Sequence, residues 1–423
     1  MLKTTPTLVE KAREIVGAAA TDDAKLKAIH EWCRIHITNL SRGTTHLTAE
    51  ERKVLKKNEN AAEILTAGKG SEADINLLFI SLAMAAGFDA RVAMCNNRFE
   101  FRYEENITEP ALVFSDLIAA VQMGGDWRYF DPGSTYLSFG QLSSKNTDTA
   151  LLVSDPNGLG RPTMIEGDPS NANCIQRKAD LRLSPTGTIE GDVVETYSGQ
   201  EDVNLKYFFE DQSPDKCAEL FRKKILRQFK HARVTNVVVE NAAGPSANLR
   251  VSYHLKIHAY AEKTGSRMFF QPAVFQKGGV KRLTLPDGER YNPLQFPHRF
   301  QTKDEIHIVL PSGYDMEPTT PPVGLDIDGL GDHDIEINLN RITKTVTYKR
   351  EFNLSKIFFP TSVYPKMKDV LRKIRERDDH TLSLKRDETI DIPQSVESED
   401  SSDELDSKTS LDDDDGDDMD FVS

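Results

Sequence analysis

Hydrophobic and polar positions follow different patterns in successive parts of the chain. In the first part, apolar side chains recur at helical spacing, and the series Leu26, Ile29, Cys33 and Ile37 predicts a helix over about residues 22–37. From about residue 90 onwards, short extended segments alternate with turns that contain Gly, Pro and Asn. We therefore predict an α+β protein in which helices come first and strands follow.

One apolar segment, from Ile75 to Ala86, has glycines on both sides. Gly68 and Gly70 precede it, and Gly87 follows it, where a glycine commonly ends a helix. The pattern predicts a buried helix with a glycine-rich entrance. The segment is shorter than the roughly 18 to 20 apolar residues that span a bilayer, so we expect no membrane insertion.

Two further helix starts are predicted from capping boxes. In this motif a Thr side chain and a Glu three residues later each bond a backbone N–H group of the first turn. Thr7 and Glu10 fit the motif, and so do Thr48 and Glu51. We therefore expect helices that begin near residues 7 and 48.

Strand-like segments divide the rest of the chain. In the first half they cover residues 90–94, 111–121 and 127–131. Beyond residue 174 strands dominate, with helices expected over about 214–229 and 363–377. The predicted later strands are 178–183, 188–197, 234–240, 247–258, 268–275, 305–310, 334–339 and 345–352. The resulting divisions are an α+β domain (1–165), a β-rich domain with one helix (166–277), a sandwich-like domain with a C-terminal helix (278–386) and a tail (387–423).

The net charge of −14 is concentrated in the tail. Residues 397–423 contain thirteen acidic side chains and one lysine, which leaves a net charge of only −2 for the rest of the chain. Such a segment repels itself and has no core, so we expect it to be disordered, with solubility as its simplest role and contact with basic partners or weak cation binding as the alternative. The near-neutral remainder disfavours nucleic-acid binding, which requires clustered Lys and Arg.

The N-terminal residues contain no apolar region of the kind found in secretory signals. Met1 leads directly into a polar, amphipathic pattern. The sequence as written therefore predicts a cytoplasmic protein. If the chain is a fragment of a longer one, the expectation changes to an exported or cell-envelope protein.

Three short motifs carry a family resemblance. The segment Gly70-Ser-Glu-Ala-Asp74 resembles the G-x-C-x-D entrance to the core helix of bacterial transglutaminase-like superfamily proteins. Phe114-Ser-Asp116 resembles their F-N-H strand, and Tyr129-Phe-Asp-Pro132 resembles their W-L-D-P segment. The resemblance implies a papain-like, transglutaminase-like module followed by a β-rich, sandwich-like companion region.

The resemblance also implies that the chemistry of the family is missing. By position, Glu72 stands at the nucleophile, Asp116 at the base and Asp131 at the residue that orients the base. In active relatives a thiolate at a helix N-terminus is paired with an imidazole. Glu72 offers no thiol, and Asp116 cannot relay protons near neutral pH as histidine does. We therefore expect a pseudoenzyme that binds a peptide or protein partner, or acts as a scaffold.

Two alternatives remain open from the sequence. A displaced thiol, for which Cys95 at the end of a predicted strand is the candidate, would give a working peptidase or glutamine acyltransferase. Alternatively, three converging carboxylates would be partly protonated, hydrated, paired with a cation such as Arg91 or Lys69, or bound to a divalent metal.

A second acidic segment invites a calcium assignment. Its alternating acids and glycines can present oxygen ligands, but Ile337 stands where an EF-hand has its closing glutamate. We therefore expect a solvated hairpin connection and no cofactor, with Ca²⁺ or another divalent cation as the alternative. The candidate ligands are Asp326, Asp328, Asp332 and Asp334.

Overall fold

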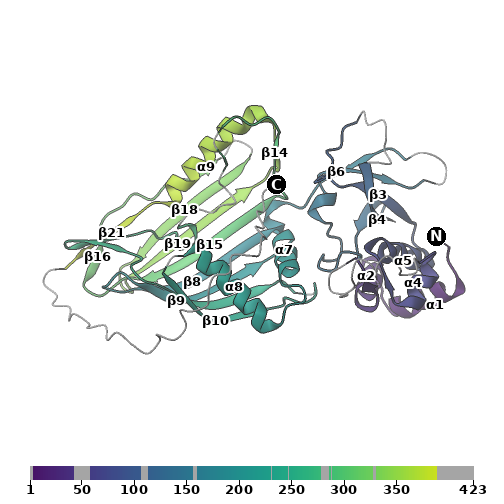
Figure 1. Cartoon of the computed structure of the whole chain (residues 1–423), viewed down its shortest axis with the longest axis horizontal. Coiled ribbons are helices and arrows are strands. Elements are labelled where there is room, and N and C mark those ends of the chain that lie inside the picture. Colours follow the sequence, from purple (N-terminus) through teal and green to yellow (C-terminus); the bar gives the residue numbers. More distant parts are fainter. Residues whose placement is uncertain are drawn as a thin grey trace, which may run out of the picture.

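The computed structural model describes residues 3–41, 58–105, 113–155, 160–229, 231–245, 247–277, 285–286, 288–326 and 330–387. Figure 1 shows a helical N-terminal module with a small sheet, next to a much larger sheet that carries its own helices. The predicted α+β class, with helices first and a β-rich region afterwards, is confirmed. The acidic tail beyond Asp387 and the predicted capping box at Thr48 lie outside the described residues.

The N-terminal module is built around one buried helix. The residues from Ile75 to Ala83 are all buried, because helices pack on one side of α5 and a sheet packs on the other. The helices of the module are α1 (Pro6–Val16), α2 (Asp22–His36), α4 (Ala61–Ala67) and α5 (Glu72–Ala85). A short parallel pair, β1 (Thr38–Asn39) and β2 (Lys69–Gly70), leads into α5.

A five-stranded sheet covers the other side of α5. Its order is β5-β4-β3-β6-β7, and every pair is antiparallel. The predicted strands at about residues 90, 111 and 127 correspond to β3, β4 and β5, although β4 begins at Phe114. The strands are β3 (Ala90–Asn96), β4 (Phe114–Met123), β5 (Asp126–Phe130), β6 (Thr149–Val153) and β7 (Thr163–Ile165), and the 3₁₀ turn η2 (Ser144–Asn146) precedes β6.

The first helix begins earlier than its predicted capping box. The Thr5 side chain accepts the N-terminal hydrogen bond from the Leu8 N–H group at 3.3 Å, and Pro6 occupies the first helical position. Thr7 therefore lies inside the helix, and the capping box predicted there is wrong. A proline fits the first turn because it has no N–H group to leave unpaired and its φ is already helical.

The β-rich region contains one large sheet in its described part. Its order is β10-β11-β9-β8-β15-β19-β18-β17, and β8 and β15 pair in parallel. These two strands lie on opposite sides of the division expected at residue 278, so that division does not separate two sheets. The strands are β8 (Cys174–Leu183), β9 (Ile189–Tyr197), β10 (Ala232–Glu240), β11 (Arg250–Ile257), β15 (Phe300–Val309), β17 (Leu325–Asp326), β18 (Gly331–Asn340) and β19 (Thr345–Leu354).

Helices and a smaller sheet cover the apolar face of the large sheet. Phe221 and Ile225 of α8 pack into one cluster, and Leu371 and Ile374 of α9 pack into another. The helices are α7 (Gln200–Phe208), α8 (Pro214–Gln228) and α9 (Tyr364–Asp378). The small sheet has the order β12-β13-β21-β16, with β12 (Glu262–Thr264), β13 (Arg267–Phe270), β16 (Tyr314–Met316) and β21 (Leu382–Arg386), and a separate pair joins β14 (Leu294–Gln295) to β20 (Phe358–Phe359).

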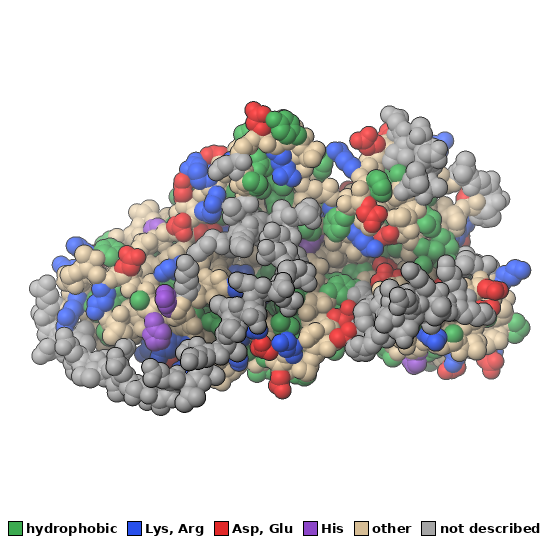
Figure 2. All heavy atoms as spheres, viewed as in Figure 1, with side chains coloured by type: hydrophobic (Ala, Val, Ile, Leu, Met, Phe, Trp, Pro, Cys, Tyr) green, Lys and Arg blue, Asp and Glu red, His purple; other side chains and the backbone are tan. Residues whose placement is uncertain are grey.

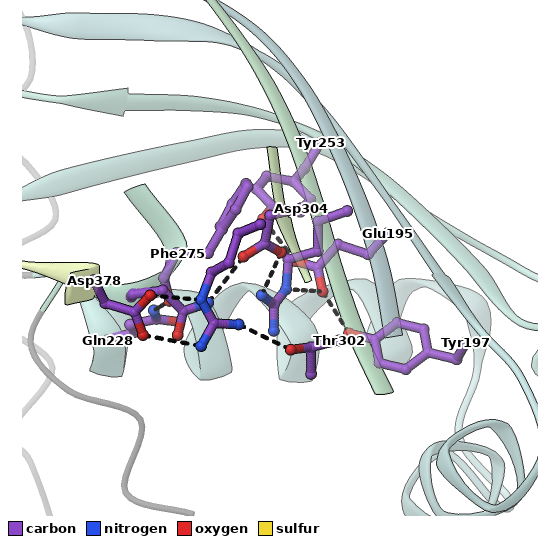
Figure 3. A network of polar contacts seen from close by, with 11 residues as sticks. Glu195, Tyr197, Gln228, Tyr253, Phe275, Thr302, Asp304 and Asp378 are labelled. Carbon is purple, nitrogen blue, oxygen red and sulfur yellow. Dashed lines mark hydrogen bonds and ion pairs between the residues drawn. The ribbon is translucent and has the colours of Figure 1, made fainter. Parts of the chain in front are cut away.

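Buried charges tie this sheet to its covering elements (Figure 3). The Arg177 guanidinium donates to Asp304 at 2.8 Å and lies 3.7 Å from Glu195. The Arg350 guanidinium donates two hydrogen bonds, of 2.7 and 2.9 Å, to the Asp378 carboxylate at the end of α9. Buried charges are tolerated only when they are paired in this way, so the network fixes α9 against β19.

Candidate functional site

Helix α5 begins with a capping box that holds Glu72 at its first position. The Ser71 hydroxyl accepts from the Asp74 N–H group at 3.2 Å, and the Asp74 carboxylate accepts from the Ser71 N–H group at 3.0 Å. A carboxylate at this position is favoured by the partial positive charge of the helix N-terminus. Glu72 is half-buried, and its own N–H group donates to Ser41 Oγ at 3.1 Å.

The segment after Asp131 packs directly against the start of α5. A Cβ atom added at Gly133 would lie 2.4 Å from the backbone oxygen of Glu72, so a side chain at residue 133 cannot be accommodated without movement. The Gly133 carbonyl accepts from Asn39 Nδ2 at 2.8 Å. This close approach brings the positions of Glu72 and Asp131 together.

Asn76 joins helix α5 to β4, the strand that contains Asp116, and to Asp131, which follows β5. Its Nδ2 atom donates to the Leu117 carbonyl and to Asp131 Oδ1, both at 2.8 Å. Its Oδ1 atom accepts from the Gly133 N–H group at 2.8 Å. The sequence analysis did not single out Asn76, although it is a polar residue in an otherwise apolar buried helix and that contrast was a usable signal.

Asp131 is buried, and its carboxyl group titrates unusually high. Burial raises the pKa of Asp131 to about 6, the hydrogen bond from Asn76 opposes this shift, and the charge of Glu72 adds to it. A smaller contribution comes from Asp116. The charges of Glu72 and Asp116 therefore both act on the buried Asp131 carboxyl group.

The positive charge at the cluster comes from Lys145 in η2. Lys145 Nζ lies 2.8 Å from Asp116 Oδ2, and Asn146 Nδ2 donates to the same oxygen at 3.0 Å. Burial alone would raise the pKa of Asp116, but the hydrogen bonds from these two residues lower it overall. The pKa of Lys145 is raised, because its pairing with Asp116 and the charges of Glu72 and Asp131 outweigh the opposing effect of burial.

The two cations suggested by the sequence are on β3 and β2. Arg91 donates two hydrogen bonds of 2.9 Å to Asp89 and stacks over Trp127, and Lys69 is exposed on β2. Lys145 was missed because nothing in the short segment around η2 distinguishes it from other surface lysines. The lysine that pairs with Asp116 is therefore distant from it in the sequence.

Cys95 lies beside the cluster but is fully buried. It stands directly opposite Asp116 in the β3–β4 pairing, and its thiol donates to the backbone carbonyls of Asn146 at 3.4 Å and Ala150 at 3.8 Å. Burial raises the pKa of the thiol to about 12, and the charges of Asp116 and Asp131 contribute to the increase. The structure thus places Cys95 near the site as a protonated thiol without solvent exposure.

The second acidic segment forms a hairpin between β17 and β18. Asp332 accepts a hydrogen bond of 3.0 Å from Asn353 Nδ2, and Asp334 is exposed. Asp328 and the side chain of Asp326 lie outside the described residues. Within the described ranges, no group of three His, Cys, Asp or Glu side chains is arranged to hold a metal ion.

Charge is otherwise distributed evenly on the visible face. Figure 2 shows acidic and basic side chains interspersed over the described surface of this view. No helix in the described part of the chain combines the length and the apolar character that crossing a membrane requires.

Comparisons with known proteins agree with the order of these elements. Residues 9–132, which include all three acidic positions, match the model of the transglutaminase-like superfamily. Residues 266–384 match a domain of unknown function with a solved structure (DUF3858). A search of the curated proteins gives no match.

Among solved structures, the chain is similar to a candidate protease from Parabacteroides distasonis, with a TM-score of 0.48 and 11% identity over 90% of this chain. It spans 55% of the length of that protein. An M1 zinc metallopeptidase from Deinococcus radiodurans gives a TM-score of 0.19 and 10% identity, with 52% of this chain and 43% of that chain covered. On the family match and the architecture together, residues 9–132 form a transglutaminase-like domain, and a β-rich region follows that domain.

Proposed function

We propose that the transglutaminase-like domain binds a peptide or protein partner and does not catalyse acyl transfer or peptide hydrolysis. The observation that carries this proposal is the pair Glu72 and Asp116, which stand where the family has its thiol and its imidazole. Neither carboxylate can act as a thiolate nucleophile, and the low pKa of Asp116 makes it a poor proton acceptor near neutral pH.

The state of the cysteines supports the same proposal. All four thiols, those of Cys33, Cys95, Cys174 and Cys217, have pKa values raised by burial. A catalytic cysteine requires a lowered pKa and some exposure, because the thiolate is the nucleophile. Cys95, the rescue candidate, is 0% exposed and bonded to backbone carbonyls.

The contacts that hold the Glu72 and Asp131 segments together also support a binding role for this site. The capping box, Asn76 and Gly133 hold the start of α5 and the Asp131 segment together through direct hydrogen bonds. The Asp116 and Lys145 side chains remain 21% and 35% exposed, so a ligand can reach both. A carboxylate next to an ammonium group presents hydrogen-bond acceptors and donors side by side, which suits the backbone of an extended peptide.

Peptide display against the full chain tests this function. We expect selected peptides to lose affinity at least about tenfold in Glu72→Gln and Asp116→Asn, since charge-assisted hydrogen bonds contribute about 1.5 to 3 kcal/mol each. Asp89→Asn is the matched control, because Asp89 is a half-exposed carboxylate of the same domain that pairs with Arg91 at the opposite end of β3.

Two results would contradict the proposal. Selected peptides that bind both site variants as well as the parent would show that the acidic positions are not the binding site. A rise in melting temperature with calcium, magnesium or manganese that is absent in Glu72→Gln would instead favour a metal site on the carboxylates.

A further inference from the structure

Helix α7 of the β-rich region has an unusual composition for its location. Although it is only nine residues long, its polar residues Gln200, Glu201, Asp202 and Lys206 are all buried. Burial of this many polar groups is costly unless each has a partner. The partners of these side chains therefore indicate what the helix holds together.

One set of partners fixes α7 within the β-rich region. Asp202 pairs with Lys206 at 2.8 Å and accepts from the Leu249 N–H group at 2.6 Å, next to the start of β11. Lys206 Nζ also donates to the Ala247 carbonyl at 2.8 Å, and Glu201 lies 2.9 Å from His298 Nε2. The helix is therefore anchored by charged contacts on one side.

The other partners belong to the N-terminal module, in the segment that follows Asp131. Gln200 Oε1 accepts from the Ser144 N–H group at 3.1 Å, and Gln200 Nε2 donates to the Leu142 carbonyl at 2.8 Å. At the far end of the helix, the Tyr207 hydroxyl lies 3.0 Å from Ser134 Oγ. The helix thus contacts the segment that contains Lys145 and the segment that follows Asp131.

The segment around Lys145 is also held from its other side. The Lys145 carbonyl accepts from the Arg98 N–H group at 3.0 Å, and Arg98 Nε donates to the Thr147 carbonyl at 2.8 Å. The same guanidinium donates to the Phe296 carbonyl of the β-rich region at 3.3 Å. The backbone on both sides of Lys145 is therefore fixed by contacts that depend on the β-rich region.

We propose that Gln200 is a positioning residue that holds η2 so that Lys145 and Asn146 face Asp116, which makes the acidic site dependent on the β-rich region. The inference concerns the site of the proposed function, but it holds whatever that site binds. A movement of α7 relative to the transglutaminase-like domain would then alter the charge of the site without any change in the site residues themselves.

The titration of Asp116, followed by NMR of its side-chain carboxyl carbon, tests the proposal without a ligand. We expect Gln200→Ala to raise the measured pKa of Asp116 toward the value found in Lys145→Met, because the ammonium group is no longer held against the carboxylate. The matched controls are Tyr207→Phe, which removes the hydroxyl contact of α7 with Ser134, and Gln228→Ala, which removes a glutamine–carbonyl hydrogen bond of 2.6 Å to Phe275. Both controls should leave Asp116 unchanged.

An unchanged Asp116 titration in a folded Gln200→Ala or Gln200→Met variant would overturn the proposal. Gln200→Met keeps a similar side-chain volume and replaces Gln200→Ala in the test if the alanine variant does not fold. Hydrogen exchange of the Ser144 amide in the unaltered chain gives an independent readout. Slow exchange supports the contact with Gln200, and exchange as fast as in an exposed loop contradicts it. Failure of peptide binding would leave these results unaffected, so the two proposals are tested separately.

Discussion

Lys145 Nζ lies 2.8 Å from the Oδ2 atom of Asp116, the residue that stands where the family resemblance expects a histidine. The ammonium group lowers the pKa of the Asp116 carboxyl, whereas burial alone would raise it. The position that the family resemblance assigns to a histidine therefore holds one half of an ion pair. Under the proposed function, the site presents these fixed charges to a ligand.

Lys145→Met should raise the pKa of Asp116, because the hydrogen bond and the positive charge that lower it are both removed. The pKa of Asp131 should rise further above its value of about 6, since Lys145 also lowers it. Carboxyl-carbon NMR titration measures both. Lys69→Met removes an exposed lysine close to Glu72 in sequence and should change neither value.

Asn76→Leu should destabilise the protein by about 2 to 4 kcal/mol, because several buried polar groups lose their partner at once. The groups affected are the Leu117 carbonyl, the Asp131 carboxyl and the Gly133 N–H. Urea unfolding measures the change. Ser81→Ala is the control on the same helix, since Ser81 is buried and its hydroxyl has no partner among the described residues. Equal losses in both variants would contradict the central role of Asn76.

The buried histidine of α2 should make stability pH-dependent. His30 is 0% exposed between Phe79 and Phe139, and neither ring nitrogen has a hydrogen-bond partner in the described part of the chain. Burial, together with the charge of Arg34, lowers the pKa of His30 from 6.5 to about 3. The unfolded chain therefore binds this proton more readily than the folded one, and stability is lost as pH falls below about 6.5.

At about 1.4 kcal/mol per pH unit of pKa difference, protonation of His30 removes on the order of 4 kcal/mol by the time the pH reaches the folded pKa. His30→Leu should flatten this part of the curve, measured by urea unfolding between pH 8 and pH 4. His36→Leu, at an exposed position of the same helix, should retain the slope of the parent. Parallel curves for His30→Leu and the parent would show that His30 does not cause the loss.

Asp378→Ala should be among the most destabilising substitutions in the β-rich region. It leaves Arg350 and His333 buried without their shared carboxylate, and removal of one partner from a buried ion pair costs about 3 to 5 kcal/mol. Asp369→Ala, on the same helix but in an exposed cluster with Arg372 and Lys373, should leave stability nearly unchanged. Thermal unfolding of both variants provides the comparison.

The sequence predicted the local elements well where one physical signal dominated. Helix α5 was recognisable because a largely apolar segment lies between Gly70 and Gly87, and α8 because its apolar residues recur at helical spacing. The start of α1 was misplaced because two threonines compete for the cap, and Pro6 decides between them. Helix α7 was missed because its buried residues are polar, which hides the apolar periodicity on which the prediction rests.

Contacts between distant segments could not be predicted from the sequence. The parallel pairing of β8 with β15 joins strands on either side of a long stretch of chain, and no local pattern indicates it. The same limit applies to the site, where Glu72, Asp116 and Asp131 could be located by resemblance but Lys145 could not. The pairing of Lys145 with Asp116 depends on the tertiary contact between η2 and β4.

Residue-resolved alkylation by iodoacetamide, read by mass spectrometry on the folded chain at neutral pH, tests the central claim most directly. We predict that Cys95 reacts no faster than Cys33, because both thiols are buried with raised pKa values. The thiol of Glu72→Cys should react about tenfold faster or more, since a helix N-terminus lowers a thiol pKa. Rapid alkylation of Cys95 in the parent chain, accompanied by amide hydrolysis or transamidation that Cys95→Ser abolishes, would contradict the account.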